Sequence, residues 1–307
     1  MEIPISTAVL DCRRQNRYKQ TGMDLQTVNQ LIRSSEPASR LWRGPMLILM
    51  GLSVLLGAAW ANPDLLPAGR TLAYVLPQCL LVAIVAVIAW DARRRRLIGR
   101  RLQEAMEAVL LQDWATARQV VCELLRSPIR QPTIRTQSLL ALAAVAETDQ
   151  HYDSAQRICE YILQTGIGSP LQQHTAEVAL GAALLRTGQT TDAVALIDRL
   201  AIQDLPGPLK AQVELLALFR EVTMGHADDS VRRADERKEL FRTHLGTRAG
   251  YGYALMAAAF DRMQQSEPAL RFWHDATLLI PPQELLKRFP EMKSVADRYP
   301  AVEYPFR

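Results

Sequence analysis

The sequence is poor in the residues and motifs on which enzymes and metal proteins depend. It has four cysteines, no two of them at C-x-x-C spacing, and five scattered histidines in 307 residues. Motifs for phosphate loops, dinucleotide binding, zinc proteases and hydrolases are all missing. The separated cysteines indicate reduced thiols that pack as small hydrophobic residues. We therefore predict a protein that is not an enzyme, with no cofactor, metal or evident small-molecule substrate. An enzyme with a dispersed site is the least favoured alternative.

Negative charge is scarce in the first third of the chain. Residues 1–101 contain 14 Lys and Arg against 6 Asp and Glu, and subtraction from the totals of 36 and 32 leaves 22 and 26 for residues 102–307. The second part is therefore mildly acidic, which excludes the concentrated positive face that nucleic-acid binding requires. Arginine (31) far exceeds lysine (5), a mix common in bacteria with GC-rich genomes, so we expect a bacterial protein.

Charge is missing altogether from two apolar runs, 44–61 and 71–90, which are 18 and 20 residues long. As a helix, each could cross a bilayer core of about 30 Å, at roughly 1.5 Å per residue. The residues between them include prolines and a glycine, which suit a tight turn. The sequence therefore predicts a transmembrane hairpin over 44–90. A buried helix of a globular domain and a cleaved signal peptide are the alternatives, and the second is disfavoured because the run begins about forty residues in.

Basic residues near the ends of the two runs predict the orientation of the hairpin. Arg40 and Arg43 precede the first run, and a cluster of arginines follows the second: Arg93, Arg94, Arg95 and Arg96. Basic residues close to a span favour the cytoplasmic side of a membrane. We therefore expect an integral protein of the bacterial inner membrane, embedded in the lipid bilayer, with both termini cytoplasmic. Residues 1–43 would form a cytoplasmic N-terminal arm.

The remainder of the chain repeats with a period near 38 residues. A small residue follows a polar turn five times, at spacings of 38, 38, 37 and 39: Ala117, Ala155, Ala193, Ser230 and Ala269. Twelve residues before each of these stand Ala105, Ala143, Gly181, Leu218 and Ala257. Small residues let two helices cross closely, so each unit is predicted to be a helical hairpin. No unit can bury its apolar face alone, so the units must stack.

These residues resemble the tetratricopeptide repeat family. The small residue of the first helix, the aromatic before the second (Trp114, Tyr152), the alanine after it and the closing Pro281 all match. The resemblance covers about residues 98–282 and implies an all-α solenoid of about five helical hairpins over 91–282. C-terminal capping helices and a tail, 283–307, would follow. The chain departs from the family in its period, which is usually about 34 residues, and in lacking the aromatic in units three to five.

In proteins of this family, the first helices line a groove that takes extended peptides or helices. By that analogy the partner-binding candidates are Gln137, Thr175, Arg186, Phe219, Tyr251, Tyr253 and Arg262. The arginines would meet acidic groups of a partner and the aromatic side chains would act as anchors. Simple packing of Phe219 and the tyrosines between units is an equally open reading. The charged helix expected at 230–245 is either a solvated face or a second surface for a protein partner.

Together these features predict a membrane-anchored scaffold that mediates protein–protein interactions at the cytoplasmic membrane face. The alternative is a structural subunit of a larger secretion or transport complex that packs through its transmembrane hairpin.

Overall fold

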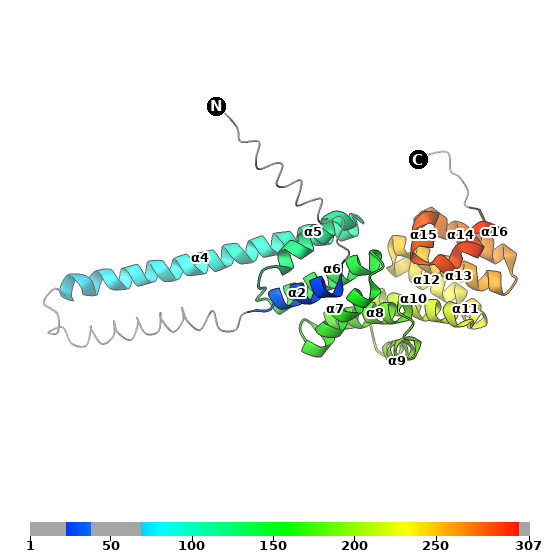
Figure 1. Ribbon diagram of the computed structural model, residues 1–307, viewed down its shortest axis with the longest axis horizontal. Helices are drawn as coiled ribbons and strands as arrows, with labels where there is room; N and C mark the ends of the chain where they lie inside the picture. The colour runs from blue at the N-terminus through cyan, green and yellow to red at the C-terminus, as the bar shows by residue number, and fades with distance from the viewer. Residues whose placement is uncertain (1–22, 38–68, 301–307) are drawn as a thin grey trace, which may run out of the picture. The chain divides into compact units, whose positions relative to one another are not determined.

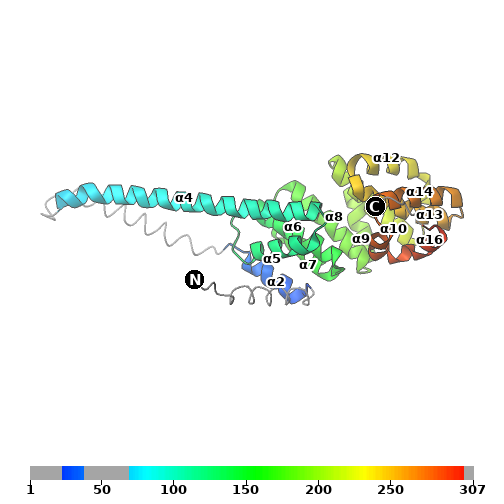
Figure 2. The ribbon, with the colours of Figure 1, turned by 90° about the horizontal axis from the view of Figure 1, so that it is seen from above.

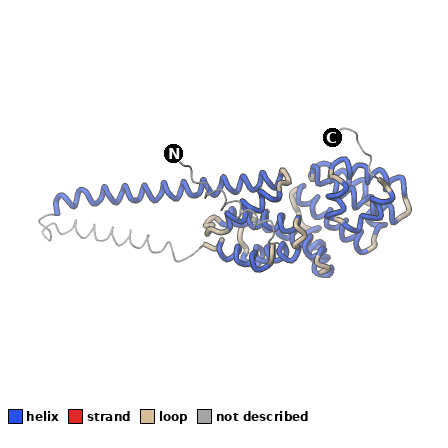
Figure 3. The backbone as a smooth tube through the Cα atoms, turned by 45° about the horizontal axis from the view of Figure 1, so that its top comes forward, coloured by secondary structure: helices blue, strands red, loops and turns tan. Residues whose placement is uncertain are grey.

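The computed structural model describes residues 23–37 and 69–300, without the side chains of 69–80 and 83. All regular structure in these residues is helical, and no strand occurs among them (Figure 3). The chain divides into two compact units, one of residues 26–145 and one of residues 146–307 together with 1–25.

The unit of residues 26–145 contains α2 (Leu25–Ser34), α4 (Gly69–Leu110), α5 (Trp114–Leu125) and most of α6 (Pro132–Thr148). Helix α5 lies along the C-terminal part of α4 (Figures 1 and 2). The buried Arg135 of α6 donates hydrogen bonds to Ser35 Oγ and Ile32 O, at 3.1 and 3.3 Å. These bonds fix the end of α2 against α6.

The predicted transmembrane hairpin is wrong. Among the described residues, no helix is both long and apolar enough to cross a membrane. The second predicted span, 71–90, is part of α4, which continues as one 42-residue helix through the exposed arginines Arg93–Arg96.

The inner-membrane location and the lipid contact were predicted from that hairpin, so neither prediction has support without it. The first predicted span, 44–61, lies outside the described residues, as do Arg40 and Arg43. The predicted boundary between residues 90 and 91 falls inside α4. The apolar side chains of α4 from Leu81 to Trp90 whose placement is described are exposed, and Arg95 pairs with Asp91 of the same helix at 2.6 Å.

Five helix pairs follow one another from the end of α4. After α4–α5 come α6–α7 (Tyr152–Thr165), α8 (Pro170–Arg186) with α9 (Thr190–Ala201), α10 (Gly207–Met224) with α11 (Ala227–Arg232) and α12 (Ala234–His244), and α13 (Ala249–Arg262) with α14 (Ser266–Leu279). The small residues that marked the period are all buried in the structure. The positions at which the sequence predicted close helix crossings are therefore core positions.

The turn inside each pair repeats the same backbone geometry. One residue has a positive φ in every turn, five residues before each marker of the period: Gln112, Gln150, Gly188, Gly225 and Gln264. The N–H of the following residue donates to the carbonyl oxygen five positions earlier, at 2.8 to 3.0 Å in all five turns. This is the left-handed helix ending that satisfies the last carbonyl groups of a helix. The period of the sequence is thus also a period of the backbone.

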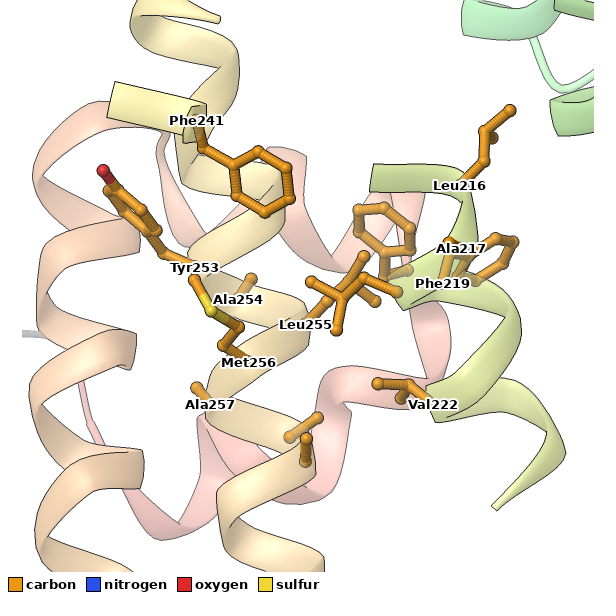
Figure 4. Close-up of a cluster of buried hydrophobic side chains, with 14 of the residues drawn as sticks. Leu216, Ala217, Phe219, Val222, Phe241, Tyr253, Ala254, Leu255, Met256 and Ala257 are labelled. Carbon is orange, nitrogen blue, oxygen red and sulfur yellow. The ribbon is translucent and has the colours of Figure 1, made fainter. Parts of the chain in front are cut away.

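The core of the unit of residues 146–307 extends from α8 and α9 through α10, α12, α13 and α14, and it includes Leu285, Phe289, Met292 and Val295 near the C-terminus. Figure 4 shows Val222 of α10 directed toward α13, and Tyr253 on the side of α13 turned away from α10. A Cβ atom at Gly252 would lie 2.4 Å from Cδ2 of the fully buried Phe241. Only glycine lets α12 and α13 approach this closely, so the packing of the core depends on that residue.

The chain continues into α15 (Pro282–Arg288), the 3₁₀ helix η3 (Pro290–Met292) and α16 (Lys293–Arg298). These lie near α13, drawn in orange to red in Figure 1. Leu285, Met292 and Val295 are buried there. We call residues 282–299 the C-terminal segment.

Candidate functional site

Three of the predicted partner-binding residues meet at one place, each from the first helix of a successive pair. Arg186 ends α8, Phe219 lies in α10 and Tyr251 in α13. The rings of Phe219 and Tyr251 both contact the ring of Phe289, with centroids 5.3 and 5.8 Å away. The guanidinium carbon of Arg186 lies 4.3 Å from the centre of Phe219 and 4.7 Å from that of Phe289. The C-terminal segment therefore adds its own aromatic residue to the predicted set.

Arg186 is held mainly by aromatic rings. Its side chain is 12% exposed, and burial lowers the pKa of its guanidinium, an effect that the nearby Glu291 carboxylate opposes. The nitrogen Nη1 of Arg186 lies 3.6 Å from Oε1 of Glu291, longer than a hydrogen bond. A desolvated cation over aromatic faces gains about 2 kcal/mol. The site thus contains a charge whose carboxylate partner is not in direct contact.

Arg288 of the C-terminal segment contacts both an acidic and an aromatic side chain of the helix pairs. Its guanidinium forms an ion pair with Glu147 and lies 4.7 Å from the centre of the Tyr251 ring. Beside it, Nε2 of Gln150 donates a hydrogen bond of 2.8 Å to the carbonyl oxygen of Lys287. We call Glu147, Arg186, Phe219 and Tyr251 the Arg186 surface. It offers an acid, two aromatic rings and a base.

The far end of the C-terminal segment is attached to α13. Nη1 of Arg298 and the hydroxyl of Tyr299 both donate to Oδ1 of Asp261, at 2.5 and 2.9 Å. Among the described residues, the backbone-to-backbone hydrogen bonds of the segment join only residues between 281 and 299. Side chains therefore attach the segment to the helix pairs.

The other predicted binding residues lie elsewhere. Gln137 belongs to the unit of residues 26–145. Thr175 donates its hydroxyl to Leu171 O of its own helix at 2.8 Å, and the exposed Arg262 donates to Val222 O. Tyr253 is buried against Phe272, with ring centres 6.3 Å apart, and burial raises the pKa of its hydroxyl. Tyr253 therefore packs inside the protein, which is the alternative to partner binding that the sequence left open for the tyrosines.

Sequence reasoning missed the partners of this surface. Arg288, Phe289 and Glu291 fall in the C-terminal capping helices and tail predicted over 283–307, and no role was predicted for Glu147. The one pattern that could have found them is the short stretch Arg288-Phe289-Pro290-Glu291, an aromatic residue between opposite charges and beside a proline. Aromatic and arginine side chains are the types that most often dominate binding energy.

A second charged cluster lies in the stretch where one charged helix was expected. Residues 230–245 form the end of α11 and all of α12, broken at Arg233, and Arg237 points inward with 1% of its side chain exposed. Nη1 and Nη2 of Arg237 donate to both carboxylate oxygens of Glu221 at 2.7 Å, and Nε donates to Glu214 at 3.2 Å. This cluster ties α12 to α10.

The protonation of the second cluster follows from these bonds. Burial alone would lower the pKa of Arg237, but the hydrogen bonds and charge of Glu221 outweigh it and raise that pKa. Burial alone would raise the pKa of Glu221, but the hydrogen bond and charge of Arg237 outweigh it and lower that pKa. Both groups are thus held in their charged forms.

A cavity of about 430 Å³ adjoins this cluster, lined in part by Arg220, Glu221 and Arg233. Arg220 already pairs with Asp198 at 2.6 Å, and Arg233 with Glu214 at 3.0 Å. The positive charges of the cavity are therefore balanced by the protein itself, and the cluster serves the packing of the helices.

Within the described ranges, no group of three or more His, Cys, Asp and Glu side chains lies close enough to hold a metal ion. The buried Cys159 packs as a small hydrophobic residue, and burial raises the pKa of its thiol to about 12. No family model, curated protein or solved structure matches this chain, so the resemblance to tetratricopeptide repeats rests on the residues that carry it.

Proposed function

We propose that this chain is a helical-repeat protein of the tetratricopeptide-like kind that acts without catalysis, as a scaffold that binds a short segment of a partner protein on the Arg186 surface. The observation that carries this proposal is the convergence of Arg186, Phe219 and Tyr251 from three successive first helices onto one short segment. Three helices that each contribute one side chain to a shared surface are what a repeat protein uses to hold a peptide.

The chemistry of the surface suits a protein ligand. Aromatic rings and arginine supply large contact areas and directional charge, and such residues carry most of the energy in protein interfaces. Glu147 and Arg186 carry opposite charges and meet different residues of the segment, Arg288 and Glu291, so a bound segment is oriented as well as held. Charge complementarity of this kind favours one direction of binding over the reverse.

The alternative of a structural subunit that packs through a transmembrane hairpin required that hairpin and is not carried forward. The charged stretch at 230–245 is also a weaker candidate for a partner surface, because its Arg237 is already used inside the protein.

A random peptide library displayed on phage tests the proposal, with the full-length chain as bait. Because Phe289 of the chain already lies on the Arg186 surface, the selection is run on the unaltered chain and on the Phe289→Ala chain. Peptides enriched on either bait should be lost when Arg186→Glu is added. Arg271→Glu is the matched control, because Arg271 is 74% exposed on α14 and lies outside the surface.

Circular dichroism would establish that the variants keep their helical content. Enrichment of the same peptides in the presence of Arg186→Glu, or enrichment on neither bait, would contradict the proposed binding surface.

A further inference from the structure

The C-terminal segment and the Arg186 surface complement each other residue by residue. Arg288 pairs with Glu147, Phe289 lies against Phe219 and Tyr251, and Glu291 faces Arg186. The segment thus offers a base, an aromatic ring and an acid in sequence order, to a surface that offers an acid, aromatic rings and a base. The match covers both charge and aromatic contact.

The segment is made of helices that are too short to be stable by themselves, as in many peptide ligands. Its helices have 7, 3 and 6 residues, far fewer than the roughly 12–15 that an isolated helix needs to persist in water. Pro282 begins it and Pro290 interrupts it. Its backbone-to-backbone hydrogen bonds stay within residues 281–299, so the contacts that hold it all involve side chains, among them the buried Leu285, Met292 and Val295.

The fit at Arg186 leaves room for a better ligand. The guanidinium and the Glu291 carboxylate approach only to 3.6 Å, although charged hydrogen bonds between such groups are usually about 2.7–2.9 Å long. A carboxylate on a separate chain, free of the geometry imposed by Pro290 and α16, can move into direct contact. The segment therefore occupies this surface without completing it.

We propose that the C-terminal segment is a built-in competitive ligand of the Arg186 surface. The partner that it excludes is a protein segment with an arginine directly before an aromatic residue and a carboxylate two residues after that aromatic. This inference rests on the proposed function and names the chemistry of its partner. Because the segment is tethered directly to α14, its effective concentration at the surface is on the order of millimolar. A partner must exceed that competition, by intrinsic affinity or by high local concentration.

Fluorescence anisotropy with a defined peptide tests the inference. The probe is a fluorescein-labelled peptide with the sequence of residues 281–300, titrated with the full-length chain and with its Phe289→Ala variant. Weakening the tethered ligand should raise the affinity for the peptide at least about tenfold, because the peptide then meets less competition. Equal binding to both chains, or binding to neither, would overturn the inference.

Matched peptides test which residues are recognised. Peptides carrying Arg288→Ala, Phe289→Ala or Glu291→Gln should each bind at least about tenfold more weakly. Peptides carrying Lys287→Ala or Glu284→Gln should bind like the unaltered one, because both side chains are exposed in the structure. Similar losses for all five peptides would show that the proposed pattern is not what the surface reads.

If the Phe289→Ala chain does not fold, a cleaved chain provides a second test of the inference. A protease site is inserted between Ile280 and Pro281 of the otherwise unaltered chain, and the cut protein is mixed with excess labelled peptide. Exchange of the peptide for the severed segment, with helical content retained, supports the inference. A severed segment that never exchanges, or helix pairs that unfold when it leaves, would make the segment a permanent part of the core instead.

The two proposals can fail separately. Phage peptides that depend on Arg186 but lack the arginine–aromatic–acid pattern would overturn this inference and leave the proposed function standing. The absence of any Arg186-dependent peptide would remove both.

Discussion

Arg186 and Arg237 belong to the same compact unit, with 12% and 1% of their side chains exposed, yet their surroundings differ. Arg237 donates hydrogen bonds of 2.7 Å to both oxygens of Glu221 and a third bond to Glu214. Arg186 lies near three aromatic rings, those of Tyr152, Phe219 and Phe289, and approaches its carboxylate, Glu291, only to 3.6 Å. The bonds of Arg237 raise its pKa against the effect of burial, whereas burial lowers the pKa of Arg186.

The difference distinguishes an arginine that holds two helices together from an arginine that is available to bind a partner. Arg237 and its carboxylates lie on α10 and α12, neighbouring helices that it binds together, so its site is complete within one helix pair. Arg186 receives its carboxylate and one of its rings from a short segment about a hundred residues away in sequence. A charge whose partners come from a short segment distant in sequence can accept the same chemistry from another chain.

Removal of the charge at Arg237 should lower the free energy of unfolding more than any other substitution considered for these two sites. Arg237→Met leaves Glu221 and Glu214 without their buried partner and should lower the free energy of unfolding by about 3–5 kcal/mol. Urea denaturation followed by circular dichroism measures it. Arg233→Met is the control, since that side chain is 43% exposed and should cost about 1 kcal/mol or less. Equal losses would mean that the Arg237 cluster is no more than a surface ion pair.

Acid should weaken the Arg237 cluster through Glu221. The pKa of Glu221 is lower in the folded chain than its ordinary value of 4.5. The stability that Glu221 contributes is therefore fully present above about pH 4.5, and it is lost as the pH falls through the lower folded pKa. Glu221→Gln should reduce stability at pH 7 and flatten its decline below pH 4.5, in urea titrations at several pH values. Glu267→Gln, exposed on α14, should leave the decline unchanged.

The same substitution at Arg186 should have a smaller effect. Arg186→Met keeps a long side chain against Phe219 and Phe289, and sulfur–aromatic contacts are themselves favourable. Its carboxylate neighbour Glu291 is partly exposed and can be hydrated when the arginine is gone. We expect a loss of about 1 kcal/mol in the free energy of unfolding, measured beside Arg237→Met. A loss as large as that of Arg237→Met would erase the distinction between the two sites.

The smallest effect is expected at the exposed pair of Arg242 and Glu239. These side chains are 70% and 63% exposed, although their nitrogen and oxygen atoms lie only 2.9 Å apart. Arg242→Ala should not measurably shift the midpoint of urea denaturation, since solvent screens such pairs. A clear shift would show that the number of ion pairs, and not their burial, governs stability in α12.

Much of the helical architecture could be read from the sequence. The small residues at Ala117, Ala155 and Ala193 indicated where helices cross, and they are buried in the structure. The left-handed glutamines at 112, 150 and 264 were not anticipated, because glutamine has no special preference for positive φ. Their conformation is imposed by the hydrogen bond that closes each helix end.

The prediction of a transmembrane hairpin is wrong, because no helix in the described part of the chain is both long and apolar enough to cross a membrane. The prediction also treated 71–90 as a separate helix, whereas α4 continues to Leu110 through the arginine cluster. The candidate site was only partly foreseen. The register of the first helices pointed to Arg186, Phe219 and Tyr251, but nothing local linked them to Phe289 or Glu291.

The sequence by itself determined the five helix pairs and their period, because helix hydrogen bonds join residues four apart and close crossings need small side chains at regular positions. The tertiary structure alone decided that Arg237 is enclosed by carboxylates and that Arg186 receives Phe289 and Glu291. The environment of a buried charge is made by residues far away in the chain, and only folding brings them together.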